Sequence, residues 1–146
     1  MTERFERSGI AVDVPDDWVL DVADEGTGWT ATIQSPGTAF ALLSLQPDAD
    51  DPAQLADLTL ESLEAEYPGL ESQDRVEQIA GQVAIGWDVD FLALDTAVSG
   101  MVRAIESPDG PLLILTQCSE MDRRMHEPGL RSILSSFVIL EGDESP

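Results

Sequence analysis

Alternating apolar and polar residues dominate positions 82–118 and predict three consecutive β-strands. In the first strand one face carries Val83, Ile85, Trp87, Val89 and Phe91, and the other carries Ala84, Gly86, Asp88 and Asp90. A period of two is typical of a pleated strand with one buried face and one wetter face. The next strands cover 97–106 and 112–118, after turns at 94–96 and 107–110, the second of which contains Pro108 and Gly110. The pattern therefore predicts a three-stranded antiparallel meander.

The N-terminal third predicts further strands. Ile10, Val12 and Val14 alternate with smaller or polar residues until Pro15 ends the strand, and Trp18 is expected to cover the edge of the core. The acidic residues 21–28 are expected to form a solvated loop. Positions 28–35 and 39–46 form a predicted hairpin, whose second strand is apolar on both sides and is therefore expected in the middle of the sheet.

Two helices follow from a change of period. Asp51, Pro52 and Gln54 have the spacing of an N-cap, a first-turn proline and a capping-box partner, and Pro68 and Gly69 end that helix. A weaker strand is predicted over 71–80. Near the C-terminus Pro128 is expected to open a second helix, with an apolar stripe of Leu130, Ile133, Leu134 and Phe137. The prediction is a single α+β domain over 1–146, with an ordered core of about 5–140: one antiparallel sheet flanked by helices.

The charge of the chain excludes some partners. It has 29 acidic residues, seven arginines and no lysine, for a net charge of −22. Codon bias of a GC-rich genome explains the absence of lysine and asparagine, and adaptation to high salt explains the dense carboxylate surface; both explanations stay open. A nucleic-acid partner is not expected, because no basic patch is present. The absence of a leader pattern and of a long apolar run predicts a cytoplasmic protein without a membrane span.

Residues with catalytic chemistry are sparse. One histidine, His126, and one cysteine, Cys118, do not supply a zinc shell, and the thiol is expected to be buried in a strand. No motif places a nucleophile beside His126. Asp88 and Asp90 share one face of a strand and are candidates for a small molecule or a divalent cation. The expectation is that the chain has no cofactor, no metal site and no enzymatic activity.

Residues 9–18 (GIAVDVPDDW) and 130–137 (LRSILSSF) resemble the opening and closing segments of PsbP-like and DcrB-like domains. The order of the predicted elements is similar as well. The resemblance implies a three-layer α/β/α sandwich without enzyme activity, in a family that includes a photosystem accessory subunit, a Ran-binding protein, bacterial lipoproteins and Eag-type secretion chaperones. The matched positions are core and turn residues, so no functional residue is carried over, and the lipid-bearing cysteine of the lipoproteins is missing here.

These observations lead to a hypothesis of a non-catalytic protein-binding or chaperone-like domain. Trp29, Trp87 and Met101 are the candidate contacts with a protein partner. The alternative is a protein that binds a small molecule or a divalent cation on an acidic sheet face, through Asp88 and Asp90. The sequence predicts no particular oligomeric state.

Overall fold

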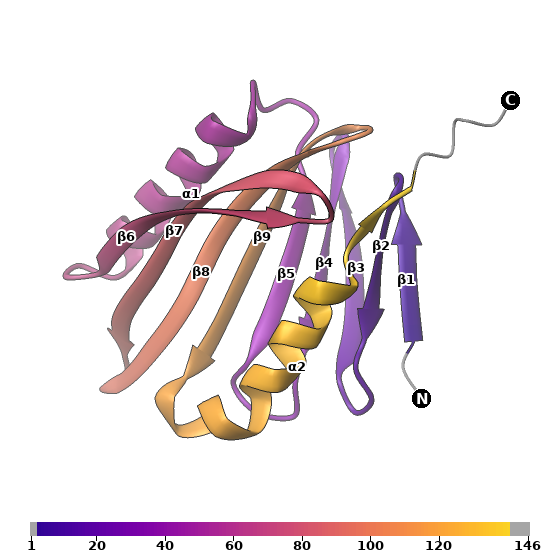
Figure 1. Cartoon of the computed structure of the whole chain (residues 1–146). Coiled ribbons are helices and arrows are strands. Elements are labelled where there is room, and N and C mark those ends of the chain that lie inside the picture. The colour runs from indigo at the N-terminus through magenta and orange to yellow at the C-terminus, as the bar shows by residue number, and fades with distance from the viewer. Residues whose placement is uncertain (1–2, 141–146) are drawn as a thin grey trace, which may run out of the picture.

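The computed structural model describes residues 3–140, which form an α+β fold around a seven-stranded antiparallel sheet (Figure 1). In spatial order the sheet runs β3-β4-β5-β9-β8-β7-β6, and a second sheet runs β1-β2-β10. The strands of the large sheet are β3 (Val19–Glu25), β4 (Gly28–Gln34), β5 (Phe40–Leu45), β6 (Glu71–Ile79), β7 (Gln82–Ala93), β8 (Thr96–Ser107) and β9 (Gly110–Ser119). The remaining elements are β1 (Glu3–Arg7), β2 (Ile10–Val14), α1 (Pro52–Glu66), the 3₁₀ turn η1 (Glu120–Asp122), α2 (Arg123–Ser136) and β10 (Val138–Ile139).

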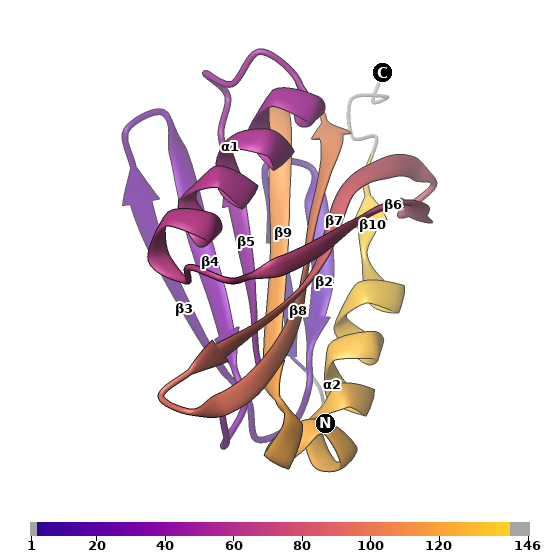
Figure 2. The same cartoon turned by 90° about the vertical axis from the view of Figure 1, so that its left-hand side faces the viewer.

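The two helices cover opposite faces of the large sheet (Figure 2). On the α1 face, Leu55 and Leu63 pack against Val102 and Leu113. On the other face, α2 and the small sheet bury the larger core cluster. Burying one such aliphatic side chain contributes roughly 1.5–3 kcal/mol, so both faces supply stability. The prediction of an antiparallel sheet flanked by helices is confirmed, and neither described helix has the length and apolar character required to span a bilayer.

The predicted meander is confirmed, with β7, β8 and β9 paired as antiparallel neighbours. Its first turn is tighter than expected, because only Leu94 and Asp95 separate the strands. The strand β5 lies between β4 and β9, which confirms the central position predicted from its apolar residues.

The first helix begins as the sequence predicts. The Asp51 carboxylate accepts a hydrogen bond of 2.8 Å from the backbone N–H of Gln54, and Pro52 occupies the first turn. The buried side of α1 contains Leu55, Ala56, Leu60 and Leu63, whereas Leu58 is exposed.

Two edge strands, β1 and β3, are not predicted by the sequence pattern. The acidic residues 21–28 were expected to form a loop, but most of them belong to β3, which pairs with β4 along its whole length. The strand β1 pairs with β2 and buries only Phe5. An edge strand needs backbone hydrogen bonds and little apolar surface, and charged side chains protect its open side from further pairing. Neither strand therefore shows the periodicity of a buried one.

The start of the second helix is also corrected. It begins at Arg123, and Pro128, expected to open the helix, lies inside it. A proline there removes one helical hydrogen bond, and its ring crowds the carbonyl of Arg124, four residues earlier. The next residue, Gly129, allows close packing, because a Cβ at this position would lie 2.5 Å from a ring carbon of Trp18. Trp18 packs against the edge of the core, as expected.

Candidate functional site

A groove of about 250 Å³ lies between α2 and the sheet strands β7, β8 and β9; we name it the sheet groove. Met101 is at its centre in the strand register, paired with Asp88 on β7 and with Thr116 on β9. The lining combines apolar side chains with charged and hydroxyl-bearing ones. The residues lining the sheet groove are Asp88, Val89, Asp90, Ser99, Gly100, Met101, Thr116, Cys118, Arg123, Glu127 and Leu130.

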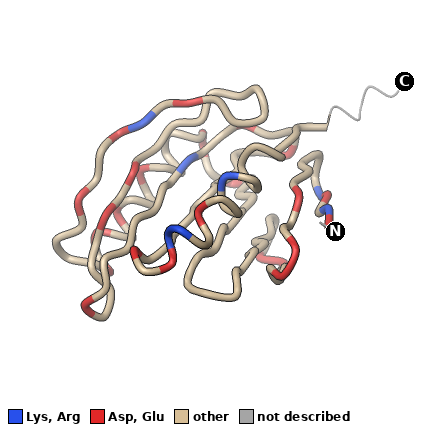
Figure 3. The backbone as a smooth tube through the Cα atoms, turned by 60° about the horizontal axis from the view of Figure 1, so that its bottom comes forward, with Lys and Arg blue, Asp and Glu red and all other residues tan. Residues whose placement is uncertain are grey.

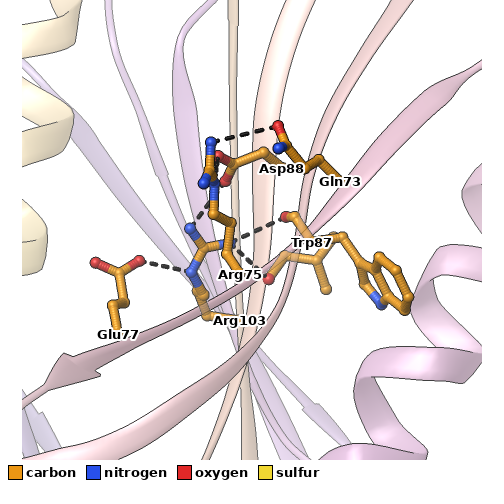
Figure 4. Close-up of polar contacts among 7 residues, drawn as sticks. Gln73, Arg75, Glu77, Trp87, Asp88 and Arg103 are labelled. Carbon is orange, nitrogen blue, oxygen red and sulfur yellow. Dashed lines mark hydrogen bonds and ion pairs between the residues drawn. The ribbon is translucent and has the colours of Figure 1, made fainter.

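Next to the groove, Arg103 forms a buried charge cluster (Figure 4). Its side chain is only 4% exposed. The guanidinium donates to the carboxylates of Glu77 and Asp88, and its Nη1 donates to the backbone carbonyls of Trp87 and Val102 at 3.0 and 3.1 Å. A buried arginine is tolerated only when its charge is paired and its N–H groups are bonded. The cluster therefore joins β6, β7 and β8 from a single side chain.

Asp88 receives two arginines at once. Arg103 Nη2 donates to Oδ1 at 2.8 Å, and Arg75 Nε donates to Oδ2 at 2.7 Å. Burial disfavours the charged form of this carboxyl, but the hydrogen bonds from Arg75 and Arg103 outweigh that effect and hold its pKa below the usual range. Asp88 is consequently ionised at neutral pH and committed to partners within the domain.

A glycine makes the cluster sterically feasible. In the strand register Gly86 lies between Arg75 and Arg103, so it leaves room for the two long side chains on either side of it. A Cβ at Gly86 would lie 1.9 Å from the carbonyl oxygen of Val102, which no side chain could accommodate without moving the strand. Close approach of β7 to β8 thus requires glycine here.

The second predicted carboxylate, Asp90, is on the same face as Asp88, as the sequence predicts. Its Oδ1 accepts a hydrogen bond of 2.8 Å from Ser99 Oγ on β8. Across the described part of the chain, no group of three or more histidine, cysteine or acidic side chains is placed to hold a metal ion. Cys118 is a buried free thiol, and burial, together with the nearby Asp122 and Glu127, raises its pKa.

The three candidate partner contacts lie in three different places. Met101 lines the sheet groove. Trp87 packs on the opposite face, towards α1, and its buried indole N–H has no hydrogen-bond partner among residues 3–140. Trp29 is 2% exposed, stacks edge-on with Phe5 and donates its indole N–H to Ser8 Oγ at 3.0 Å. The structure therefore corrects the placement of Trp29 among the partner contacts, because it is a core residue.

The structure also shows a polar junction that sequence reasoning missed. The Asp122 carboxylate accepts hydrogen bonds from the backbone N–H and the hydroxyl of Thr38, which lies in the turn between β4 and β5. These two bonds lower the pKa of Asp122. A Cβ on Gly37 would come within 2.7 Å of Asp122 Oδ2 and 3.0 Å of His126 Nε2, so a larger residue in the turn would crowd both side chains. The sequence pattern predicts only the hairpin that contains this turn.

His126 belongs to this junction and is not a lining residue of the sheet groove. It is largely buried near the start of α2 and lies edge-on to Trp18, with ring centroids 6.0 Å apart. The structure therefore brings Asp88, Asp90 and Met101 together in one groove and keeps the only histidine outside it.

Comparison with known proteins defines the fold. A scan against protein-family models gave no match, and neither did a search of curated proteins. Solved structures that match include cyanobacterial PsbP from Synechocystis sp. PCC 6803 (TM-score 0.64, 12% identity, 94% of this chain and 92% of that one). They also include LpqN of Mycobacterium tuberculosis, involved in cell envelope biogenesis (TM-score 0.57, 14% identity, 96% of this chain and 91% of that one). A third is PA94 of Pseudomonas aeruginosa, described as a protein of unknown function and putative regulator (TM-score 0.55, 17% identity, 92% of this chain and 94% of that one). The fold is therefore PsbP-like, as the sequence resemblance implies.

Proposed function

We propose that the chain is a non-catalytic domain that binds a protein partner in the sheet groove. Supporting this is the way the groove combines an accessible apolar side chain with polar groups that already have partners. Met101 is that side chain and lies beside the buried Leu130, whereas the Val89 side chain packs with Leu60 on the opposite face of the sheet. A flexible thioether such as Met101 adapts to the shape of an inserted side chain, which suits recognition of a peptide segment.

The chemistry of the carboxylates also favours binding over catalysis. A general acid or base must be able to exchange a proton with a substrate and needs a pKa near the working pH. The pKa of Asp88 is moved in the opposite direction, and both of its oxygens accept hydrogen bonds from arginines. The Asp90 carboxylate is held by Ser99. We infer that these groups shape and rigidify the groove.

A comparative pull-down tests this proposal. The wild-type domain, Met101→Glu and Leu58→Glu would each be used to capture proteins from an extract of the native organism, followed by quantitative mass spectrometry. Leu58 is a matched control, because it is an exposed apolar residue on α1, on the opposite face of the sheet. We expect a partner that is reproducibly captured by wild type and Leu58→Glu and lost by Met101→Glu. Capture that is equal for all three proteins, or no reproducible partner, would contradict the proposal.

The cation-binding alternative remains a prediction with its own measurement. Calorimetry with Ca²⁺ and Mg²⁺ at low and high salt should show heat that disappears in Asp88→Ala if the acidic face binds a cation. Because Asp88 is already neutralised by Arg75 and Arg103, we expect no such heat.

A further inference from the structure

The turn between β7 and β8 carries an unusual residue for its backbone conformation. Leu94 and Asp95 both have positive φ, 53° and 65°. Two-residue hairpin turns with this geometry are dominated by asparagine and glycine, and a bulky aliphatic residue in the left-handed region is a conformational outlier. Leu94 is also 98% exposed. The leucine therefore costs stability, and almost no contact within the domain offsets that cost.

Leu94 borders a second depression, which is separate from the sheet groove. This cleft has a volume of about 440 Å³ and is built from three connections: the β4–β5 turn, the β7–β8 turn and the segment after β9. Val98 and Ala93 contribute apolar surface, and Met121, 85% exposed, lies on its rim. We name this depression the Leu94–Met121 cleft. A strained exposed leucine beside an exposed methionine and an apolar cleft is typical of an interaction surface.

The charges around the cleft define the partner. Asp95 follows Leu94 in the turn, Asp122 lines the cleft, and Glu120 precedes Met121. The nearby Arg123 is paired with Glu120 and Glu127, and Arg124, which lines a neighbouring depression with Met121, adds one positive charge, so Asp95 and Asp122 carry the negative charge of the cleft. The low pKa of Asp122 keeps that carboxylate charged. A second copy of this chain would bring another net charge of −22 to the same surface and be repelled, whereas a basic segment would be attracted.

We propose that the Leu94–Met121 cleft docks a basic, amphipathic segment of another protein, with a large apolar side chain of that segment entering the cleft. This inference goes beyond the proposed function, because it places a second contact, with a partner of stated chemistry, at a surface separate from the sheet groove. Leu94 is then the exposed anchor of the domain, which explains why asparagine or glycine does not occupy the turn.

The direct experiment measures binding of a fluorescent 18-residue peptide with leucine and lysine at helical spacing, by anisotropy at near-physiological salt. Two control peptides replace every leucine by serine or every lysine by glutamate. The proteins are wild type, Leu94→Asn, Met121→Ser, the groove variant Met101→Glu and the control Leu92→Asn. Leu92 is a neighbouring exposed leucine, 68% exposed, whose side chain alternates to the opposite face of β7 from Phe91 and Ala93.

We expect the leucine–lysine peptide to bind wild type at least tenfold more tightly than either control peptide. Leu94→Asn and Met121→Ser should each weaken binding about tenfold, while Leu92→Asn and Met101→Glu leave it unchanged. Leu94→Asn should also raise the urea midpoint of unfolding, which shows that lost binding is not lost folding.

Three results would overturn the inference. Equal binding of the leucine–lysine and serine–lysine peptides would show attraction to the overall charge alone. Loss of binding in Met101→Glu but not in Leu94→Asn would assign the segment to the sheet groove, so that the proposed function survives and this inference fails. A wild-type dimer in light scattering that becomes monomeric in Leu94→Asn would make the occupant a second copy of the chain.

Discussion

The Arg103 cluster and the Leu94 turn lie at different places on the same pair of strands, β7 and β8, and differ in the burial and pairing of their side chains. Around Arg103, every charged group has a partner within the domain, and the guanidinium is 4% exposed. At the turn, an aliphatic side chain is held in an unfavourable backbone conformation and is 98% exposed. The Arg103 cluster therefore stabilises the fold, whereas the backbone conformation of Leu94 destabilises it.

This contrast shows how to separate structural residues from binding residues in a highly acidic protein. Charged side chains attract attention as candidate sites, but here the most conspicuous carboxylate, Asp88, is part of the internal framework. Acidic positions are distributed over much of the chain, whereas basic ones are few (Figure 3). A fully exposed leucine that costs stability is the more informative signal.

The largest expected effect comes from removing the buried cation. Arg103→Met should lower the free energy of unfolding by about 3 kcal/mol, because Glu77 loses its partner, Asp88 keeps only Arg75, and the carbonyls of Trp87 and Val102 lose a donor. Urea denaturation monitored by circular dichroism would measure the loss. The control is Arg75→Met, which removes an arginine that is 49% exposed from the same carboxylate and should cost about 1 kcal/mol or less. Equal losses in the two variants would show that burial of Arg103 is not what matters.

A smaller effect of opposite sign is expected at the turn. Leu94→Asn should increase the free energy of unfolding by about 1 kcal/mol, because asparagine tolerates the left-handed region at lower cost. Leu92→Asn, in regular strand conformation, should not increase stability. The comparison uses the same denaturation experiment, and a loss of stability in Leu94→Asn would mean that the leucine makes contacts that support the fold.

The smallest effect concerns pH. The pKa of Asp88 is lower in the folded protein than in the unfolded chain, where it is about 3.9, so its contribution to stability is complete above that value. The contribution is lost as the pH falls through the folded pKa. The stability difference between wild type and Asp88→Asn should therefore shrink below about pH 4. Because the Asp88 side chain is 38% exposed, we expect a change below about 1 kcal/mol. A difference that stays constant from pH 7 to pH 2 would contradict this linkage.

The sequence predicts the elements whose apolar residues show strong periodicity. It does not predict strands that are held mainly by backbone hydrogen bonds and bury few side chains. The meander, the β4–β5 hairpin and the start of α1 each carry a local signal, such as alternation or a cap. The strands β1 and β3 contain mainly exposed side chains, so their burial pattern gives no period to detect. Pro128 predicts a helix start, because proline is favoured in a first turn, but α2 begins earlier, at Arg123.

The candidate site was predictable only in part. Alternation placed Asp88 and Asp90 on one face, but the partners of Asp88 depend on strand register. Once the turn is fixed at Leu94 and Asp95, that register pairs Gly86 with Arg103 and Asp88 with Met101. The tightness of this turn is therefore the missing piece of information. The cytoplasmic location and the origin of the acidity, in codon bias or in high salt, stay predictions.

The order of strands in the large sheet has a consequence for how the chain reaches its native state. The strands β3 to β5 pair with their neighbours in sequence, and so do β6 to β9, whereas the β5–β9 pairing joins residues as distant as Phe40 and Gln117. Bringing these two segments together requires closure of a loop of roughly 70 residues, whose entropic cost precedes any gain from packing. We therefore expect two locally assembled ribbons to appear early in refolding and their zipping along β5 and β9 to set the rate.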